Sequence, residues 1–210
     1  MAIGIEEFSK FMSENKGKRK FKQSVELAIN FKGIDFTKQD NRLNLEVNLP
    51  NGKGKSRKVA VFAVDKNVIE DANKNGINVI QGNELESISK DQKRLNDLIQ
   101  YDLVAQPSLM PTIARSLGQF LGPRGKMPKP LLPGMSLGSM SGELQKRIDI
   151  KSKGKYLPTV HTLVGSEDME PQKLYDNIDE VIKAVVKKVG QGRIRSAYVK
   201  LTMSKPIKFM

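Results

Sequence analysis

Residue types that could catalyse a reaction are few in this chain. His161 is the single histidine, and the 210 residues contain no cysteine. Without a second histidine or a thiolate, His161 cannot build the usual zinc site, and it has no obvious nucleophile to serve. A chain without cysteine also forms no disulfide, which fits a reducing compartment. We therefore expect no metal site and no catalytic centre, and we interpret His161 as a structural or RNA-contacting strand residue.

Acidic side chains, the usual general acids and bases, form two clusters before and on a predicted amphipathic helix at residues 171–189. The first cluster comprises Glu167, Asp168 and Glu170, and the second comprises Asp176, Asp179 and Glu180. Acidic groups at a helix N-terminus compensate the helix dipole. We interpret both clusters in this way, as dipole compensation and a solvated face, so they do not predict an enzyme.

Two glycine-containing strings have letters of phosphate-binding loops but lack their context. Gly54-Lys55-Ser56 resembles the end of a P-loop, which needs a glycine five residues earlier and a helix afterwards. Leu49 stands at the earlier position, and a strand-like run follows the string. Gly190-Gln191-Gly192 fails the dinucleotide fingerprint because Arg195 stands where the third glycine belongs. Neither string predicts a nucleotide site, and we expect no cofactor.

Basic residues give the clearest functional signal. Lys and Arg outnumber Asp and Glu by 36 to 23, and the formal net charge of +13 indicates a polyanionic partner. A basic stretch covers residues 16–22, and no acidic residue follows Glu180, although eight basic ones do. Lys and Arg pair with phosphates, and short hydroxyls can reach ribose 2′-OH groups. The pattern favours nucleic acid.

The elements that must position these residues fall into two kinds. Residues 24–32, 42–49 and 196–203 alternate apolar and polar side chains, which predicts strands with one core face and one wet face. Residues 59–64, 78–80 and 103–105 are apolar apart from Asn78, and helical patterns at 68–75 and 84–100 separate them. Such alternation predicts a buried parallel sheet in a Rossmann-like layered structure. A short helix is expected near residues 5–12.

Two Gly/Lys-rich connectors, at residues 50–55 and 151–155, separate the two kinds of strand. We therefore predict one discontinuous domain made of residues 1–52 and 155–210, with residues 53–154 inserted as a second domain. Six of the ten prolines lie in a Pro/Gly-rich region that runs from Pro107 to Gly142. Within it, Leu121–Pro130 is predicted to be an extended basic loop. It either folds back on the middle domain or contacts RNA as a finger through Arg124, Lys126 and Lys129.

Several strings, spread over nearly the whole chain, resemble one family. They are Lys20-Phe21 with Ser24, the runs Leu49–Lys55 and Leu121–Pro130, His161–Gly165 with Glu167-Asp168-Met169, and Ser196–Met203. Their order and spacing are similar to those of the ribosomal protein L-one family, the mobile-stalk proteins of the large ribosomal subunit, in its archaeal type.

The resemblance implies an α/β fold: a terminal domain with a split βαβ antiparallel sheet and an inserted Rossmann-like three-layer domain. It implies a cytoplasmic structural constituent of the large subunit that binds large-subunit rRNA and forms the mobile stalk at the tRNA exit site. Family members assist release of deacylated tRNA, and bacterial and archaeal members repress translation of their own mRNA through a similar leader site. The protein is expected to be monomeric when free and to bind no membrane, since no window approaches the ~18 apolar residues of a membrane helix.

The resemblance also implies an RNA-binding site. Phe21 and Met203 would pack on ribose or base, while Ser24, Glu26, Ser196 and Thr202 would hydrogen-bond to the RNA. The whole expected site comprises Lys20, Phe21, Ser24, Glu26, His161, Gly165, Ser196, Lys200, Thr202, Met203 and Ser204. Ser204 replaces the usual family glycine, which implies either a looser backbone approach to RNA or an added hydroxyl contact.

Two alternatives remain open. The middle domain could belong to a nucleotide-using α/β enzyme, or the whole chain could be a basic RNA chaperone without site preference. A nucleotide-binding screen beside a filter-binding assay with large-subunit RNA separates these readings.

Overall fold

The computed structural model describes residues 3–55, 57–132, 134–152 and 157–210. The chain divides into two compact units, Met1–Lys55 with Gln145–Met210 (unit 1) and Ser56–Leu144 (unit 2). The sequence placed these divisions at 52/53 and 154/155; the second falls among residues 153–156, which lie outside the described residues. Residues 145–152 belong to unit 1 because they include a strand with the alternating Ile148 and Ile150 buried. That strand was not predicted.

Unit 1 contains a split βαβ arrangement, as expected. Its elements are α1 (Ile5–Asn15), β1 (Ser24–Phe31), β2 (Asn44–Asn48), β7 (Arg147–Lys151), β8 (Thr159–Ser166), α7 (Pro171–Val189), β9 (Ile194–Leu201) and β10 (Ile207–Lys208). The main sheet has the order β10-β9-β1-β8, and β2 pairs with β7 in a separate ribbon. Because β8 and β9 are both antiparallel to β1, they run parallel to each other on either side of it. The helix α7 makes the crossover between them.

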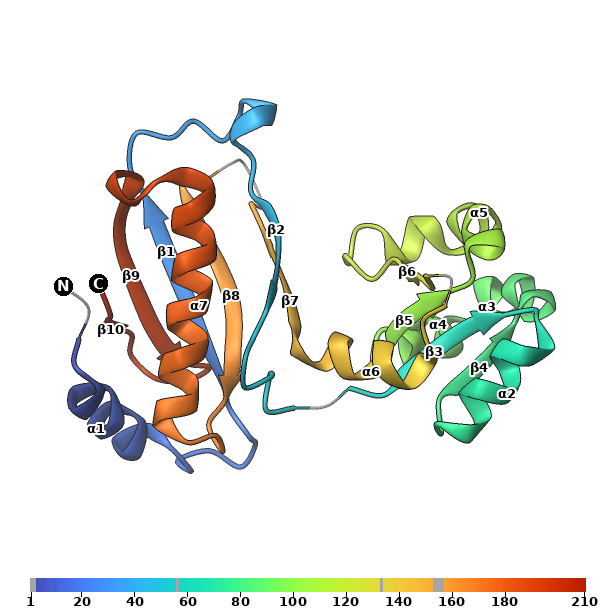
Figure 1. Ribbon diagram of the computed structural model, residues 1–210, viewed down its shortest axis with the longest axis horizontal. Coiled ribbons are helices and arrows are strands. Elements are labelled where there is room, and N and C mark those ends of the chain that lie inside the picture. Colours follow the sequence, from blue (N-terminus) through green and yellow to red (C-terminus); the bar gives the residue numbers. More distant parts are fainter. Residues whose placement is uncertain (1–2, 56, 133, 153–156) are drawn as a thin grey trace. The chain divides into compact units, whose positions relative to one another are not determined.

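The core of unit 1 lies on one face of this sheet. Strand β1 buries every second residue, from Val25 to Phe31. Helix α7 buries Leu174, Ile178, Val181 and Val185, which recur at helical spacing, in the same cluster. Figure 1 shows α7 lying along the sheet, with α1 beside it. The alternate residues of β1 therefore point to the opposite face.

Unit 2 is a three-layer α/β structure, as expected. Its elements are β3 (Val59–Ala63), α2 (Lys66–Lys74), β4 (Asn78–Gln81), α3 (Leu85–Lys90), α4 (Gln92–Leu98), β5 (Asp102–Ala105), α5 (Met110–Leu121), β6 (Lys129–Pro130) and α6 (Leu137–Lys146), whose last two residues belong to unit 1. The sheet order is β4-β3-β5-β6, and every pair is parallel. Ala60 and Phe62 pack with α3, α4 and α5, whereas Val61 packs with α2 and α6. Both faces of the sheet are thus covered.

Local chemistry changes two predicted segments. The helix expected over residues 84–100 is broken into α3 and α4, because the Asp91 carboxylate accepts hydrogen bonds from Lys93 N and Arg94 N and caps a new helix. The Pro/Gly-rich region, for which no helix was predicted, contains α5 and most of α6. Pro111 stands in the first turn of α5, where a missing N–H costs nothing. None of the helices described is both long and apolar enough to cross a membrane.

Candidate nucleic-acid interface

The face of the main sheet opposite α7 carries a polar and aromatic surface. Across β8, β1 and β9, the register aligns Leu163 with Glu26 and Lys200, His161 with Ala28 and Tyr198, and Thr159 with Asn30 and Ser196. We call this surface the open face. Four of the predicted site residues therefore share one face, namely Glu26, His161, Ser196 and Lys200.

Hydrogen bonds order one side of the open face. Asn30 Nδ2 donates to Ser196 Oγ at 3.0 Å, and Thr159 Oγ1 donates to Asn30 Oδ1 at 2.9 Å. These bonds run across three strands, so they hold the three side chains in a fixed row. Ser196 is only 8% exposed. Its hydroxyl belongs first to this row, which limits how far it can reach toward an RNA.

A second group of predicted residues gathers where β1 begins and β9 ends. Ser24 N donates to Thr202 Oγ1 at 3.0 Å, and Thr202 N donates to Ser24 O at 3.1 Å. Phe21 and Met203 flank this pair in sequence and are 50% and 55% exposed. We call Phe21, Ser24, Thr202 and Met203 the end cluster. Two large apolar side chains kept in water beside hydrogen-bonding groups indicate a binding surface.

The remaining predicted residues of unit 1 have different surroundings. Lys20 is exposed. Ser204 Oγ accepts from Leu201 N at 2.9 Å and donates to Lys205 O at 2.9 Å, so its hydroxyl closes the chain's own turn. Gly165 is buried, and a Cβ there would lie 2.9 Å from Met169 Sδ and would collide with the Leu174 side chain. Gly165 therefore allows α7 to pack closely on β8, a structural role that the resemblance did not imply.

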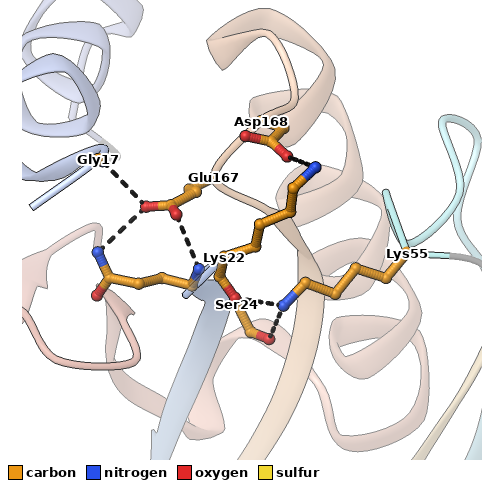
Figure 2. Close-up of polar contacts among 7 residues, drawn as sticks. Gly17, Lys22, Ser24, Lys55, Glu167 and Asp168 are labelled. Carbon is orange, nitrogen blue, oxygen red and sulfur yellow. Dashed lines mark hydrogen bonds and ion pairs between the residues drawn. The ribbon is translucent and has the colours of Figure 1, made fainter. Parts of the chain in front are cut away.

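Glu167 corrects one interpretation of the sequence. We expected it in a solvated acidic cluster, but it is 5% exposed and accepts hydrogen bonds from Gln23 N (2.9 Å), Gln23 Nε2 (3.1 Å) and Gly17 N (3.3 Å). Figure 2 shows the carboxylate between these donors. Burial raises the pKa of Glu167, but the three hydrogen bonds outweigh it and hold that pKa below its ordinary value. The ionised carboxylate thus ties the loop before β1 to the loop after β8.

Gln23 connects this carboxylate to the end cluster, and sequence reasoning missed it. The side chain is 2% exposed, and its Oε1 accepts from Met203 N at 3.1 Å. The backbone that carries Met203 is therefore fixed through Gln23 to Glu167. A glutamine beside a basic stretch carries no local signal for such a role.

Cations lie around the start of β1. Lys22 Nζ pairs with Asp168 Oδ2 at 2.7 Å, and this hydrogen bond holds the pKa of Asp168 below its ordinary value. Lys55 Nζ donates to Lys22 O at 2.5 Å and lies 3.5 Å from Ser24 Oγ (Figure 2). A residue of the predicted connector therefore adds positive charge to the end cluster.

The first connector is held firmly on unit 1. The buried Asn177 amide donates to Gly52 O at 2.9 Å and to Val164 O at 2.8 Å, and its Oδ1 accepts from Asn51 N at 3.1 Å. Gly54 has φ +68°, and a Cβ there would lie 2.6 Å from Met169 Sδ. The glycine of the P-loop-like string thus serves close packing. Ser56 of that string lies outside the described residues.

The basic loop of unit 2 folds back on its own unit. Lys126 Nζ donates to Tyr101 O at 3.1 Å and pairs with Asp102 Oδ1 at 3.4 Å. Burial and the neighbouring Arg57 lower the pKa of Lys126, although Asp102 opposes them. Arg124 lies 3.9 Å over the Phe120 ring, and Lys129 begins β6. Of the two readings that the sequence left open, this geometry favours the folded-back loop.

The nucleotide-using alternative can be examined at the C-terminal ends of β3 and β5. Ligands of doubly wound sheets bind there, where the strand order reverses. Gln106 is 5% exposed, and its Oε1 accepts from Val64 N at 2.7 Å and from Asp65 N at 3.2 Å. Its Nε2 donates to Asp65 Oδ2 at 2.6 Å. The backbone donors that would meet a phosphate are thus occupied by the chain itself, which argues against this alternative.

The structure gathers no metal-ligand set: among the described residues, no three His, Asp or Glu side chains lie together in a way that could hold a metal ion.

Comparison with known proteins finds one family. The profile described as "Ribosomal protein L1p/L10e family" matches residues 11–205. The chain is 42% identical over 195 residues to the large ribosomal subunit protein uL1 of Thermococcus kodakarensis, covering 90% of this chain and 89% of that one. It is 43% identical over 195 residues to uL1 of Pyrococcus horikoshii (90% and 88% covered). Over 212 residues it is 36% identical to uL1 of Methanothrix thermoacetophila (99% of each chain).

Proposed function

The chain belongs to the ribosomal protein L1p/L10e family, and from this we propose that unit 1 binds large-subunit ribosomal RNA through its end cluster and open face. As a family member, the protein is a structural constituent of the large ribosomal subunit and acts in translation. The proposal concerns the finer question of which residues meet the RNA.

The end cluster carries the proposal. Phe21 and Met203 are 50% and 55% exposed, and hydrogen bonds from Met203 N through the Gln23 side chain to Glu167 fix the backbone at Met203. An apolar side chain carried on a fixed backbone can pack on ribose or base with a smaller loss of conformational entropy than one on a mobile segment. Lys20, Lys22 and Lys55 add cations that can pair with phosphates.

The family resemblance supports three further steps. We propose that the RNA-bound protein forms the mobile stalk beside the exit site, that the stalk assists release of deacylated tRNA, and that the free protein represses its own mRNA. A rigid site that recognises a folded RNA can bind the same fold in another transcript, which supports the last of these. Footprinting on intact large subunits, with and without deacylated tRNA, tests the first two.

Filter binding with large-subunit rRNA tests the proposed site on the full chain. Phe21→Ala and Met203→Ala should each weaken binding by about 1–3 kcal/mol if each packs on a base or ribose. Val64→Ala is a matched control, because Val64 is 58% exposed but lies in unit 2. Equal affinities for all three variants and the parent would refute the end cluster as the site.

A salt series separates specific recognition from the RNA-chaperone alternative. The affinity should fall with salt by a log–log slope of ~0.7–0.9 per phosphate neutralised. Preference for the ribosomal site should persist at elevated salt, because Phe21, Thr202 and Met203 carry no charge. Loss of all site preference at moderate salt would favour the chaperone.

A further inference from the structure

A recess opens in the middle of the open face and lies outside the end cluster. Its volume is about 340 Å³, and its lining includes Glu26, Ala28, Asn30, His161, Tyr198 and Lys200. That volume is at the lower end of the roughly 300–1,000 Å³ typical of small-ligand pockets. Strand β1 rises about 3.4 Å per residue, so Ala28 lies about 14 Å along the strand from Ser24.

The strand register explains why the recess exists. Ala28 stands opposite Tyr198 on β9 and opposite His161 on β8. The methyl group of Ala28 is therefore the floor between two ring side chains that stand up from neighbouring strands. Those two strands are roughly 10 Å apart, twice the spacing of paired strands. A larger residue at position 28 would fill this space.

Polar side chains lie on both sides of the recess, before and after Ala28 along β1. Glu26 and Lys200 are aligned on one side, where they offer a hydrogen-bond acceptor and a donor. Asn30 lies on the other side, held in place by its bonds to Ser196 and Thr159. The walls are thus ring side chains, and the rim can both donate and accept hydrogen bonds.

We propose that this recess holds one unpaired nucleobase of the bound RNA, stacked on Tyr198, with its edge toward Glu26, Lys200 or Asn30. The proposal rests on the proposed function, since the base belongs to the same RNA that the end cluster contacts. A nucleobase is flat, with apolar faces and an edge that carries donors and acceptors. Proteins that read unpaired RNA stack such bases on aromatic side chains and bond their edges.

A phosphate fits the recess less well than a base does. The Glu26 carboxylate would repel it, and Ala28 and Tyr198 would leave most of its oxygens without donors. The cations of the neighbouring end cluster, including Lys22 and Lys55, are better placed for the backbone. The recess would thus take one unpaired base, while the cations beside the end cluster meet the RNA backbone.

Full-length variants that change only the recess test this inference by filter binding with large-subunit rRNA. Tyr198→Leu removes the ring, and Ala28→Leu fills the floor from the solvent side. Each should weaken binding by roughly 5- to 150-fold, the range for loss of one base stack. Tyr198→Phe keeps the ring and should bind within about threefold of the parent, a difference of less than about 0.7 kcal/mol. Thermal unfolding of each variant checks its fold.

A spectroscopic measurement does not depend on those variants. The chain contains no tryptophan, so Tyr198→Trp introduces a single reporter in the recess. Stacking of a base on the indole should quench its emission as rRNA is added, and competitor RNA lacking the site should leave the emission unchanged. Unchanged emission at saturating rRNA would overturn the inference.

The outcomes keep the two proposals apart. If the parent shows no preference for large-subunit rRNA, the proposed function fails and the inference fails with it. If the parent binds specifically and both Tyr198→Leu and Ala28→Leu bind equally well, only the inference fails.

Discussion

Strand β1 in the sheet of unit 1 and strand β3 in the sheet of unit 2 both lie next to an edge strand and pair on both sides. They nevertheless bury their side chains differently. Every second residue of β1 is buried, whereas all five residues of β3, Val59–Ala63, are buried. Unit 1 covers one face of its sheet with α7 and α1 and leaves Glu26, Ala28 and Asn30 on the other. Unit 2 uses both faces for its own core. The difference shows which sheet retains a face with which to meet a partner.

The polar side chains of the two units differ in the same sense. In unit 2, Gln106 and Lys126 use their polar groups to satisfy the chain's own backbone and Asp102. In unit 1, Gln23 and Glu167 also bond internally, but the consequence is to fix Met203 in an exposed position. Internal hydrogen bonds in unit 2 therefore only satisfy buried polar groups. In unit 1 they also hold an exposed residue, Met203, in place.

The largest expected difference in stability is between substitution of Phe62, buried in the core on β3, and substitution of Glu26, which lies on the open face on β1. Phe62→Ala should lower the free energy of unfolding of unit 2 by about 3–5 kcal/mol, because Phe62 is fully buried. Glu26→Ala should change the stability of unit 1 by no more than about 0.5 kcal/mol. Denaturant titration monitored by circular dichroism measures both. Comparable losses would mean that the open face is part of a core.

A buried amide in unit 1 should give the next largest effect. Asn177→Leu removes the partners of Gly52 O, Val164 O and Asn51 N, and each buried group left unsatisfied costs about 1–3 kcal/mol. Gln172→Ala is the control, since Gln172 lies on the same helix and bonds only to the exposed Asp176 at 2.9 Å. Hydrogen exchange should also show faster exchange of the Asn51 amide. Equal stability of the two variants would show that the connector is not held by Asn177.

Thr202→Val tests whether RNA binding and protein stability can be changed independently in the end cluster. The family resemblance implies that Thr202 hydrogen-bonds to the RNA, so this substitution should weaken RNA binding. The hydroxyl accepts from Ser24 N, so we now expect a loss of about 1 kcal/mol of stability as well. Filter binding and thermal unfolding measure the two losses, and Thr37→Val, in an exposed loop, is the control. Unchanged stability would return Thr202 to a purely RNA-facing role.

The smallest effect concerns pH. Because the pKa of Glu167 is lower in the folded protein than its ordinary value of 4.5, its contribution to stability is fully present above that value. The contribution is lost as the pH falls through the lowered pKa. Glu167→Gln should therefore be less stable than the parent at pH 7, and the difference should shrink below about pH 4.5. Glu170→Gln, which changes an exposed carboxylate, should show a smaller difference at every pH.

The sequence predicted those parts of the molecule whose signal is local. Alternating apolar and polar residues predicted β1 and β9, and uniformly apolar runs predicted β3 and β5. The helical spacing of Leu174, Ile178 and Val181 predicted α7. The strand β7 was missed because its five residues, Arg147–Lys151, merge into a Gly/Lys-rich stretch. Helix α5 was not predicted, because Pro111, which stands in its first turn, was grouped with the other prolines of the Pro/Gly-rich region.

Non-local contacts account for the errors in the site. Glu167 was read as a solvated acid, because its partner Gln23 is 144 positions away. Gly165 was predicted as an RNA contact, and nothing in the sequence indicated that it also lets Leu174 pack closely on β8. The recess at Ala28 likewise depends on the register of three strands that are not consecutive in the chain. Such features arise only when the sheet is assembled.

The position of β1 between β8 and β9 has a consequence for protein synthesis. Val25 pairs with Gly165 on one side and with Leu201 on the other, so β1 has no partner in the main sheet until residues far behind it have been made. Unit 2 is continuous over residues 56–144 and can fold first. At about 5–20 residues per second, β1 waits several seconds as an unpaired, half-apolar strand, a period of exposure to aggregation. A nascent chain acquires its open face only when β9 emerges, so an unfinished copy lacks the complete surface that we propose for RNA.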